Sequence, residues 1–160
     1  MKDNIIIYTD GGCRGNPGLG AWASILISEK YNLRLEIGES EDMTTNNKME
    51  MKAVIKALER LKNSHNIKVY SDSAYLVNGM NGWIYTWQKN NWIKSDKKPV
   101  ENKEYWLKLI ELSKKHNIEF IKVKGHSDNK ENNRADEIVN ILMDEHENTG
   151  NIASFYNKIN

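Results

Sequence analysis

The first third of the chain carries the hydrophobic patterns of β-strands. Residues 5–8 form an unbroken apolar run, which is typical of a strand buried on both faces of a sheet. Residues 21–27 form a second apolar run, and residues 31–38 alternate polar and apolar side chains, as in a half-exposed strand. The pattern therefore predicts an antiparallel meander of three strands, the first of which covers residues 4–10.

The rest of the chain alternates between the helical repeat of apolar residues and short strand-like runs. Helices are predicted over residues 46–62, from Ser73 onward, over 100–116 and over about 131–145. Short strands are predicted over 67–71 and 118–123, with a Trp- and Lys-bearing excursion over 83–98 and a loose polar tail from Glu147. This order predicts one α/β domain in which helices cover both faces of a mixed sheet.

A glycine-rich segment, residues 11–20, lies between the first two predicted strands. It does not have the spacing G-x-G-x-x-G, and a strand rather than a helix follows it. A dinucleotide site or a P-loop needs a helix N-terminus at this point to bind phosphate. Both kinds of nucleotide site are therefore excluded.

Composition narrows the class of protein further. At 160 residues the chain can form one domain, and its net charge of +1 excludes a generic polyanion binder. No segment approaches the ~20 consecutive apolar residues of a membrane span, so we expect neither a transmembrane helix nor a signal peptide. The single cysteine, Cys13, excludes an internal disulfide and suits a reducing compartment. We expect a cytoplasmic monomer without membrane contact.

Four carboxylates stand where a structural role alone explains them poorly. Asp10 and Asp72 end predicted strands, Glu50 projects into the apolar stripe of the first long helix, and Asp136 lies early in the last helix. Three of them also have an ordinary explanation. An Asp-Gly turn would account for Asp10, a capping interaction with Asn47 for Glu50, and the helix dipole for Asp136.

Taken together, the four carboxylates could converge at one end of the sheet. They would repel one another unless a cation joined them, and oxygen ligands without a Cys/His cluster favour a hard divalent ion. Two such ions ~4 Å apart would activate a water and stabilise the leaving oxygen of a phosphodiester. His126, in a polar loop ten residues before Asp136, would be placed to shuttle a proton, or is simply a solvated loop residue.

Several motifs then resemble those of the type 1 ribonuclease H family. They are residues 8–18 (YTDGGCRGNPG), 44–50 (TTNNKME), 71–73 (SDS), 96–100 (DKKPV), 123–126 (VKGH) and 134–136 (RAD). The resemblance extends in order from residue 5 to about residue 145. It implies the ribonuclease H-like α/β fold, with a five-stranded mixed sheet, a catalytic domain over residues 1–146 and a polar C-terminal tail over 147–160.

The resemblance also implies an activity. Members of this family are endonucleases that hydrolyse the RNA strand of RNA/DNA hybrids and leave 3′-hydroxyl and 5′-phosphate ends. By this likeness Asp10, Glu50, Asp72 and Asp136 would hold two Mg²⁺ ions, with Mn²⁺ as a substitute. His126 would help the product to leave or assist proton transfer.

Substrate contacts are implied in the same way. Cys13, Asn16 and Asn46 would follow the hybrid near the scissile RNA strand, where 2′-hydroxyls mark RNA. Thr45 and Asn102 would grip a phosphate of the DNA strand. The excursion corresponds to the family's basic protrusion, which here carries Trp83, Trp87, Trp92, Lys89, Lys94, Lys97 and Lys98. At least one of these tryptophans is expected only to pack the protrusion onto the body.

The chain departs from the family pattern at two places. The protrusion is less cationic than in well-known bacterial members, because it carries Gln88, Asn90, Asn91, Ile93 and Glu101. Met43 also stands where many members have an arginine in the phosphate pocket. Both departures predict weaker binding of the hybrid with the metal ligands intact.

Two other classes of function compete with this interpretation. A related fold member could act as another polynucleotidyl transferase or as an exonuclease, which would cleave DNA or free ends. A hybrid-binding module without catalysis is the third possibility. The four carboxylates argue against a mere binder, because they would repel the phosphates that have to approach.

Overall fold

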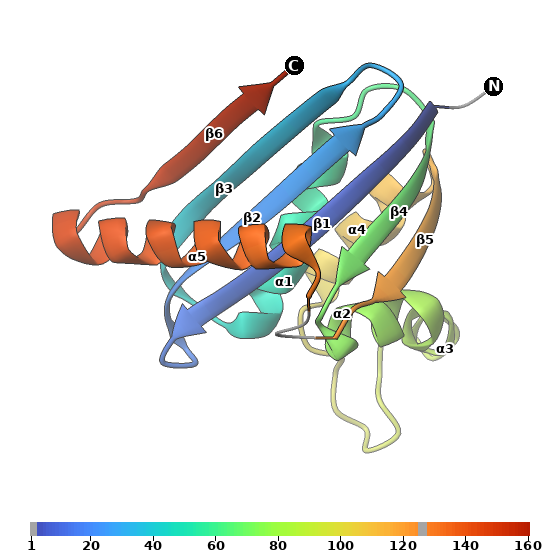
Figure 1. Ribbon diagram of the computed structural model, residues 1–160. Helices are drawn as coiled ribbons and strands as arrows, with labels where there is room; N and C mark the ends of the chain where they lie inside the picture. The colour runs from blue at the N-terminus through green and yellow to red at the C-terminus, as the bar shows by residue number, and fades with distance from the viewer. Residues whose placement is uncertain (1–2, 125–127) are drawn as a thin grey trace.

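The computed structural model describes residues 3–124 and 128–160, and it has an α/β fold in which helices cover both faces of one mixed sheet (Figure 1). The strands lie in the order β5-β4-β1-β2-β3-β6. They are β1 (Asp3–Arg14), β2 (Gly18–Ser28), β3 (Leu33–Thr44), β4 (His65–Ser71), β5 (Asn117–Lys122) and β6 (Ser154–Ile159). The helices are α1 (Asn46–Glu59), α2 (Ala74–Asn78), α3 (Ile84–Lys89), α4 (Lys103–Ser113) and α5 (Lys130–Thr149), and a π-helical segment, Gly79–Trp83, joins α2 to α3.

The predicted antiparallel meander and the mixed sheet are confirmed. Strands β1, β2 and β3 pair antiparallel in sequence order, and β4 pairs in parallel with both β1 and β5. The carboxyl ends of β1, β4 and β5 therefore point toward the same edge of the sheet. In α/β sheets such an edge is where functional groups gather.

The sheet has six strands rather than the five expected, and the expectation of a loose tail from Glu147 is wrong. Helix α5 continues to Thr149 and ends at Gly150, whose left-handed backbone (φ 73°) lets its N–H donate to the His146 carbonyl over 2.8 Å. The chain then returns as β6, which pairs antiparallel with the free edge of β3. The assignment of the catalytic domain to residues 1–146 stays a prediction.

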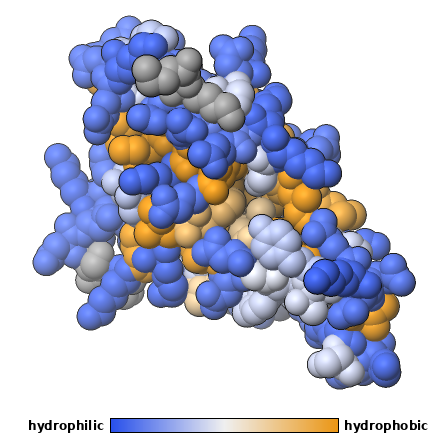
Figure 2. All heavy atoms as spheres, turned by 90° about the vertical axis from the view of Figure 1, so that its right-hand side faces the viewer, coloured by the Kyte–Doolittle hydropathy of each residue, from blue (hydrophilic) through white to orange (hydrophobic). Residues whose placement is uncertain are grey.

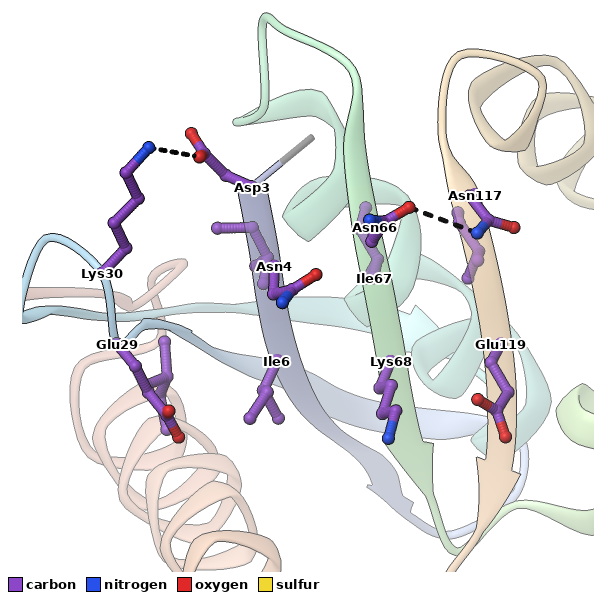
Figure 3. Close-up of a pocket in the computed structure, with 13 residues that line it drawn as sticks. Asp3, Asn4, Ile6, Glu29, Lys30, Asn66, Ile67, Lys68, Asn117 and Glu119 are labelled. Carbon is purple, nitrogen blue, oxygen red and sulfur yellow. Dashed lines mark hydrogen bonds and ion pairs between the residues drawn. The ribbon is translucent and has the colours of Figure 1, made fainter. Parts of the chain in front are cut away.

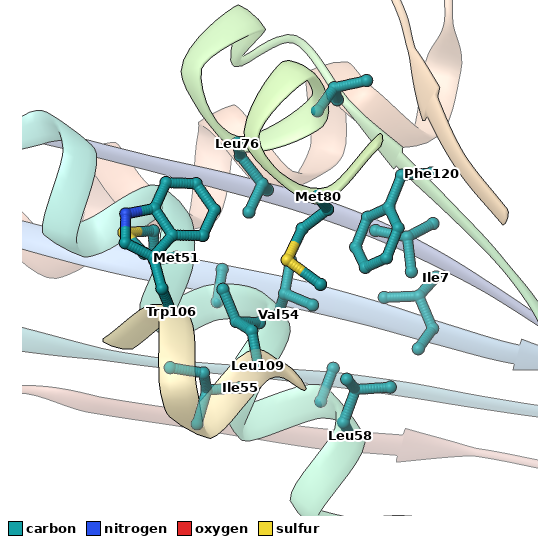
Figure 4. Close-up of a cluster of buried hydrophobic side chains, with 14 of the residues drawn as sticks. Ile7, Met51, Val54, Ile55, Leu58, Leu76, Met80, Trp106, Leu109 and Phe120 are labelled. Atoms are coloured by element: carbon teal, nitrogen blue, oxygen red, sulfur yellow. The ribbon is translucent and has the colours of Figure 1, made fainter. Parts of the chain in front are cut away.

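Two apolar layers hold the helices on the sheet. Helices α1 and α4 pack on one face, where a large core includes the fully buried Trp106, Met51 and Leu109 (Figure 4). Helix α5 packs on the other face over β1, β2 and β3 through a smaller core that contains Ile138 and Leu142. This second core fixes the direction in which α5 crosses the sheet.

The alternation of polar and apolar residues in β3 predicted a strand with one face exposed to solvent. In the structure α5 covers that polar face. Glu36 and Ser40 on that face are 2% and 1% exposed. Between them, a side chain on Gly38 would place its Cβ 2.8 Å from Leu142 Cδ1, so glycine allows α5 to lie close to the strand. The alternation is correct, but the partner of the polar face is a helix and not water.

The structure also corrects one helix boundary. The helix predicted from residue 100 begins at Lys103, because Asn102 has a left-handed backbone (φ 60°) that an α-helix cannot include. Among the described residues, no helix is long and apolar enough to cross a membrane.

Candidate active site at the carboxyl ends of β1 and β4

Adjacent parallel strands deliver the first two carboxylates. Tyr8 of β1 lies opposite Tyr70 of β4, so Asp10 and Asp72 each follow two residues later on neighbouring strands. Asp10 is 9% exposed, and Asp72 is partly buried just beyond the end of β4. The prediction that the first strand ends at Asp10 is wrong, because β1 continues to Arg14, but Asp10 does lie beside the point where the parallel strand β4 ends and Asp72 follows.

Glu50 reaches the same place because α1 crosses β1 at a glycine. A Cβ on Gly11 would lie 2.5 Å from the Glu50 nitrogen and 2.4 Å from the Met49 carbonyl carbon. Only a residue without a side chain lets the first turns of α1 come this close to β1. The backbone of Glu50 thus passes directly over the strand that carries Asp10.

The capping explanation for Glu50 does not hold. Thr45 is the N-cap of α1, and its Oγ1 accepts a hydrogen bond of 3.2 Å from the Lys48 nitrogen. A capping-box acid would be expected three residues after the cap, at Lys48, and Glu50 lies two residues further on. The Glu50 side chain is 7% exposed, and its Oε1 has no hydrogen-bond partner among the described residues.

Asp10, Glu50 and Asp72 form a compact acidic group. One carboxylate oxygen from each lies within 4.8 Å of those of the other two. Burial, and then the charges of Asp72 and Asp136, raise the pKa of Asp10 to about 8. Burial, followed by the charges of Asp10 and Asp72, likewise raises the pKa of Glu50 well above its usual value. Converging oxygens and an orphaned buried oxygen fit a divalent cation, which would compensate these charges.

Asp136 approaches the group from α5. It is exposed, and it is close enough to Asp10 for its charge and a hydrogen bond between the two side chains to raise the pKa of Asp10. It does not belong to the set of three whose oxygens converge most tightly. The fifth predicted catalytic residue, His126, lies outside the described residues.

The residues expected to follow the RNA strand form one hydrogen-bond network beside the acidic group. The Cys13 backbone N–H donates to Asn46 Oδ1 over 2.9 Å, and the Asn46 N–H donates to Asn16 Oδ1 over 3.1 Å. Cys13 Sγ lies 3.5 Å from the same Asn16 oxygen. The network ties the turn after β1 to the start of α1, and it leaves the amide NH₂ groups of both asparagines without a partner among the described residues.

Next to this network lies a hollow of about 500 Å³ that contains the predicted phosphate contacts Thr45 and Asn102. The hollow is also lined by Lys48, which was not among the predicted site residues although it lies within the TTNNKME motif. Glu101 and Glu104 bring negative charge to the same rim. Asn102 is oriented by a 3.1 Å hydrogen bond from its Nδ2 to the Tyr75 hydroxyl.

The protrusion combines packed and exposed aromatic rings. Trp92 is 9% exposed, and the Trp87 ring centroid lies 5.5 Å from that of the fully buried Trp106, so these rings pack the protrusion onto the body. Trp83 is 41% exposed and lines a hollow of about 820 Å³ together with Lys89 and Lys97. In Figure 2 the lowest lobe of the molecule, which is this protrusion, carries a largely hydrophilic surface. Lys98, also predicted to bind substrate, is exposed but does not line the hollow.

Another hollow, of about 770 Å³, lies at the opposite end of β1 from Asp10 (Figure 3). Its wall includes an ion pair of 2.9 Å between Lys30 Nζ and Asp3 Oδ1, and a hydrogen bond of 3.2 Å from Asn117 Nδ2 to Asn66 Oδ1. Its side chains carry both signs of charge and none of the predicted site residues. We therefore place the candidate active site at the acidic group.

Comparison with known proteins agrees with this placement. A family model described as RNase H matches residues 2–142. The Ribonuclease H of Caldanaerobacter subterraneus subsp. tengcongensis is 52% identical over 150 residues, which are 91% of this chain and 97% of that protein. The Ribonuclease H of Chlorobaculum parvum is 51% identical over 146 residues, which are 91% of this chain and 99% of that protein.

Solved structures give the same result. LC11-RNase H1 in complex with RNA/DNA hybrid is 31% identical, with a TM-score of 0.68, and the match covers 89% of this chain and 99% of that one. LC9-RNase H1, a type 1 RNase H with the type 2 active-site motif, has a TM-score of 0.82 over 97% of this chain and 79% of that one, and at 23% identity it shows the shared fold. Because the family model matches most of its length and these relatives share about half of their residues with it, the chain belongs to the ribonuclease H family.

Proposed function

We propose that this protein is an endonuclease that hydrolyses the RNA strand of RNA/DNA hybrids and leaves 3′-hydroxyl and 5′-phosphate ends. The observation that carries the proposal is the acidic group, in which oxygens of Asp10, Glu50 and Asp72 lie within 4.8 Å of one another. Burying like charges this closely has an energetic cost that a stable fold alone would not require. The names of its relatives, and the hybrid bound to LC11-RNase H1, support the same substrate.

The four carboxylates Asp10, Glu50, Asp72 and Asp136 would hold divalent ions, which we propose are two Mg²⁺, with Mn²⁺ as a substitute. When bound, these ions would supply an activated water and neutralise the charge that develops on the leaving oxygen. Glu50 and Asp10 would be the closely fixed ligands, because α1 and β1 come into backbone contact at Gly11. Asp136 adds an exposed carboxylate from the other face.

The surrounding residues would orient the hybrid. The amide groups of Asn16 and Asn46, which have no hydrogen-bond partner within residues 3–124 and 128–160, would meet the RNA strand next to Cys13, where 2′-hydroxyls distinguish it from DNA. Thr45, Asn102 and Lys48 would hold a phosphate of the DNA strand in their hollow.

The remaining roles are proposed on the family likeness. Trp83, Lys89, Lys97 and Lys98 would contact the duplex from the protrusion. His126 would assist proton transfer or product release. We propose further that the enzyme is a cytoplasmic monomer and that residues 1–146 carry the catalysis.

A direct test compares substrates under identical conditions. RNA/DNA hybrid, RNA duplex and DNA duplex, each end-labelled, are incubated with the protein in Mg²⁺ or in EDTA. We expect internal cuts in the RNA strand of the hybrid alone, only with Mg²⁺, and fragments whose 3′ ends a polymerase can extend.

Asp10→Asn and Glu50→Gln should abolish cleavage while hybrid binding remains measurable, because the proposed phosphate contacts lie elsewhere. Glu145→Gln, at an exposed position of α5, is the control and should cleave normally.

Each alternative has its own result in this assay. Cleavage of the DNA duplex, or shortening from the ends, would identify another polynucleotidyl transferase or an exonuclease. Hybrid binding by the unmodified protein without cleavage at any Mg²⁺ concentration would identify a binding module. More than a few per cent of activity in Asp10→Asn would contradict the metal role of the acidic group.

A further inference from the structure

Strand β3 contacts α5 along nearly the whole length of the helix through side chains of one face. Glu36 binds Arg134 near the start of α5, and Ser40 Oγ lies 2.7 Å from His146 Nδ1 near its end. Between them, Gly38 lies against Leu142. The helix is therefore attached to β3 by two separate polar links, one at each end of a close apolar contact.

The first link is an ionic cluster of partly buried side chains around the buried Glu36 carboxylate. Glu36 Oε2 accepts hydrogen bonds of 3.0 Å from Arg134 Nε and from Arg34 Nη2, and Glu36 Oε1 accepts one of 3.1 Å from Arg134 Nη2. Arg34 also pairs with Glu131, which lies one turn before Arg134 on α5. The cluster thus attaches the first two turns of α5 to β3, with the Glu36 carboxylate at its centre.

Strand β6 completes the surroundings of Glu36. Asn157 lies opposite Glu36 in the sheet, and its Nδ2 donates to Glu36 Oε1 over 3.0 Å. The Phe155 ring lies beneath the Arg134 guanidinium at 5.6 Å from the ring centroid, which favours the cation. The strand that was expected to be a loose tail therefore fixes two members of the cluster.

This cluster lies next to a proposed metal ligand. Arg134 is two residues before Asp136, and Ala135 between them is fully buried against the sheet. Asp136 itself is exposed, so its approach to Asp10 depends on where the start of α5 lies. A shift of these first turns would move Asp136 while Asp10, Glu50 and Asp72 stayed in place.

We propose that Glu36 is a positioning residue for the active site: together with Arg34 and Asn157 it holds Arg134, and through it the first turns of α5, so that Asp136 stays beside Asp10. The inference rests on the proposed role of Asp136 as a metal ligand. A purely stabilising role would lower the stability of the protein but would not predict weaker metal binding. Removing one partner of a buried charge pair destabilises a protein wherever the pair lies.

The second polar link supplies the matched control for the test. Glu36→Gln and Ser40→Ala each remove a buried polar contact between β3 and α5, but their partners Arg134 and His146 lie twelve residues, or roughly 18 Å, apart along the helix. Mg²⁺ binding to each free protein is measured by calorimetry. Hydrogen exchange of the amides of residues 131–136 is measured alongside, because neither measurement requires cleavage.

Glu36→Gln should weaken Mg²⁺ binding by about tenfold, at the lower end of what loss of a supporting contact costs a metal site. The same variant should speed exchange at the start of α5, and Ser40→Ala should do neither. Asn157→Ala, which removes one hydrogen bond from an edge strand and should fold, is expected to act in the same direction with a smaller effect.

Equal losses of Mg²⁺ binding in Glu36→Gln and Ser40→Ala, or unchanged binding in both Glu36→Gln and Asn157→Ala, would overturn the inference. Absence of hybrid cleavage by the unmodified protein would instead reject the proposed function.

Discussion

At the scale of single residues, Asp10 shows the conflict between stability and function. Its carboxyl is buried next to Glu50, Asp72 and Asp136, and its pKa is raised by burial and by the charges of Asp72 and Asp136 from 3.8 to about 8. Between these pH values the native state keeps a proton that the unfolded state has lost. Stability in the absence of metal must therefore fall as pH rises from about 4 to about 8.

Asp10→Asn removes this cost, so we expect it to melt above the unmodified protein in EDTA at neutral pH. The gain at pH 7 should be at most about 4 kcal/mol, because the cost builds up over about three pH units above the unfolded pKa and each unit corresponds to about 1.36 kcal/mol. The difference should shrink toward pH 4 and also in millimolar Mg²⁺, which stabilises the unmodified site by mass action. The measurement is a series of thermal melts from pH 4 to 8, with EDTA and with Mg²⁺. A variant that melts lower in EDTA would show that the carboxylates are not clustered in solution.

A different residue, Ser40, shows that a familiar set of side chains need not be catalytic. Ser40, His146 and Asp42 are joined by contacts of 2.7 Å, in the order found in serine hydrolases. However, Ser40 is 1% exposed, and its Oγ also accepts a hydrogen bond of 2.7 Å from the Ala153 nitrogen. No substrate could reach such a hydroxyl. The three residues therefore have a structural role, in which they join β3 to α5 and to Ala153, the residue before β6.

At the scale of elements, β6 is held on β3 by the antiparallel backbone pairing of the two strands, by the Ser40–His146–Asp42 contacts and by the Glu36 cluster. Deleting residues 151–160 would remove the Ala153 bonds to Ser40 and the Asn157 bond to Glu36, and would leave buried polar groups unpaired. We expect unfolding to become easier by roughly 2–3 kcal/mol, which is a loss of about 5–10 °C in Tm for a chain of this size. Thermal melts of the shortened protein test this, with full-length Lys158→Ala, an exposed position on the same strand, as the control. Identical melts for the shortened and full-length proteins would mean that the segment is the loose tail first expected.

The elements around the acidic group also show which features can be predicted from the sequence and which cannot. Glu50 and Asp72 could be found because each breaks a local pattern, a helical stripe or the end of a strand. The covered face of β3 could not be found, because Glu36 and Arg134 lie 98 residues apart and each alone resembles a solvated charge. Strand β6 was missed because it is short, although Phe155, Tyr156 and Ile159 favour a strand and Gly150 gave a helix-stop signal that could have set the end of α5. Lys48 was missed because its hollow exists only once Glu101 and Asn102 fold against α1.

At the scale of the whole molecule, a net charge of +1 leaves little general attraction for a nucleic acid. Affinity for the hybrid must then depend on local cations, and the protrusion presents Lys89, Lys94 and Lys97 around a hollow that also contains the neutral Asn90 and Ile93. Fewer cations release fewer counterions, so the dependence of affinity on salt should be shallow for this chain.

Adding cations at Gln88, Asn90 and Ile93 should tighten hybrid binding and steepen its salt dependence. These positions are exposed, and they avoid Asn91, whose left-handed backbone (φ 54°) would be strained by lysine. Each new phosphate contact should change the slope of log affinity against log salt by about −0.9, as measured for duplex DNA. The dissociation constant is measured over a range of salt concentrations with Asp10→Asn present throughout, so that the hybrid is not cleaved.

The control places three lysines at Asn148, Asn151 and Ile152, which are exposed around the end of α5, away from the protrusion (Figure 1). Because both triple variants gain the same net charge, a steeper slope in the protrusion variant alone would identify direct phosphate contacts. Equal slopes in the two variants would show that the protrusion does not touch the substrate.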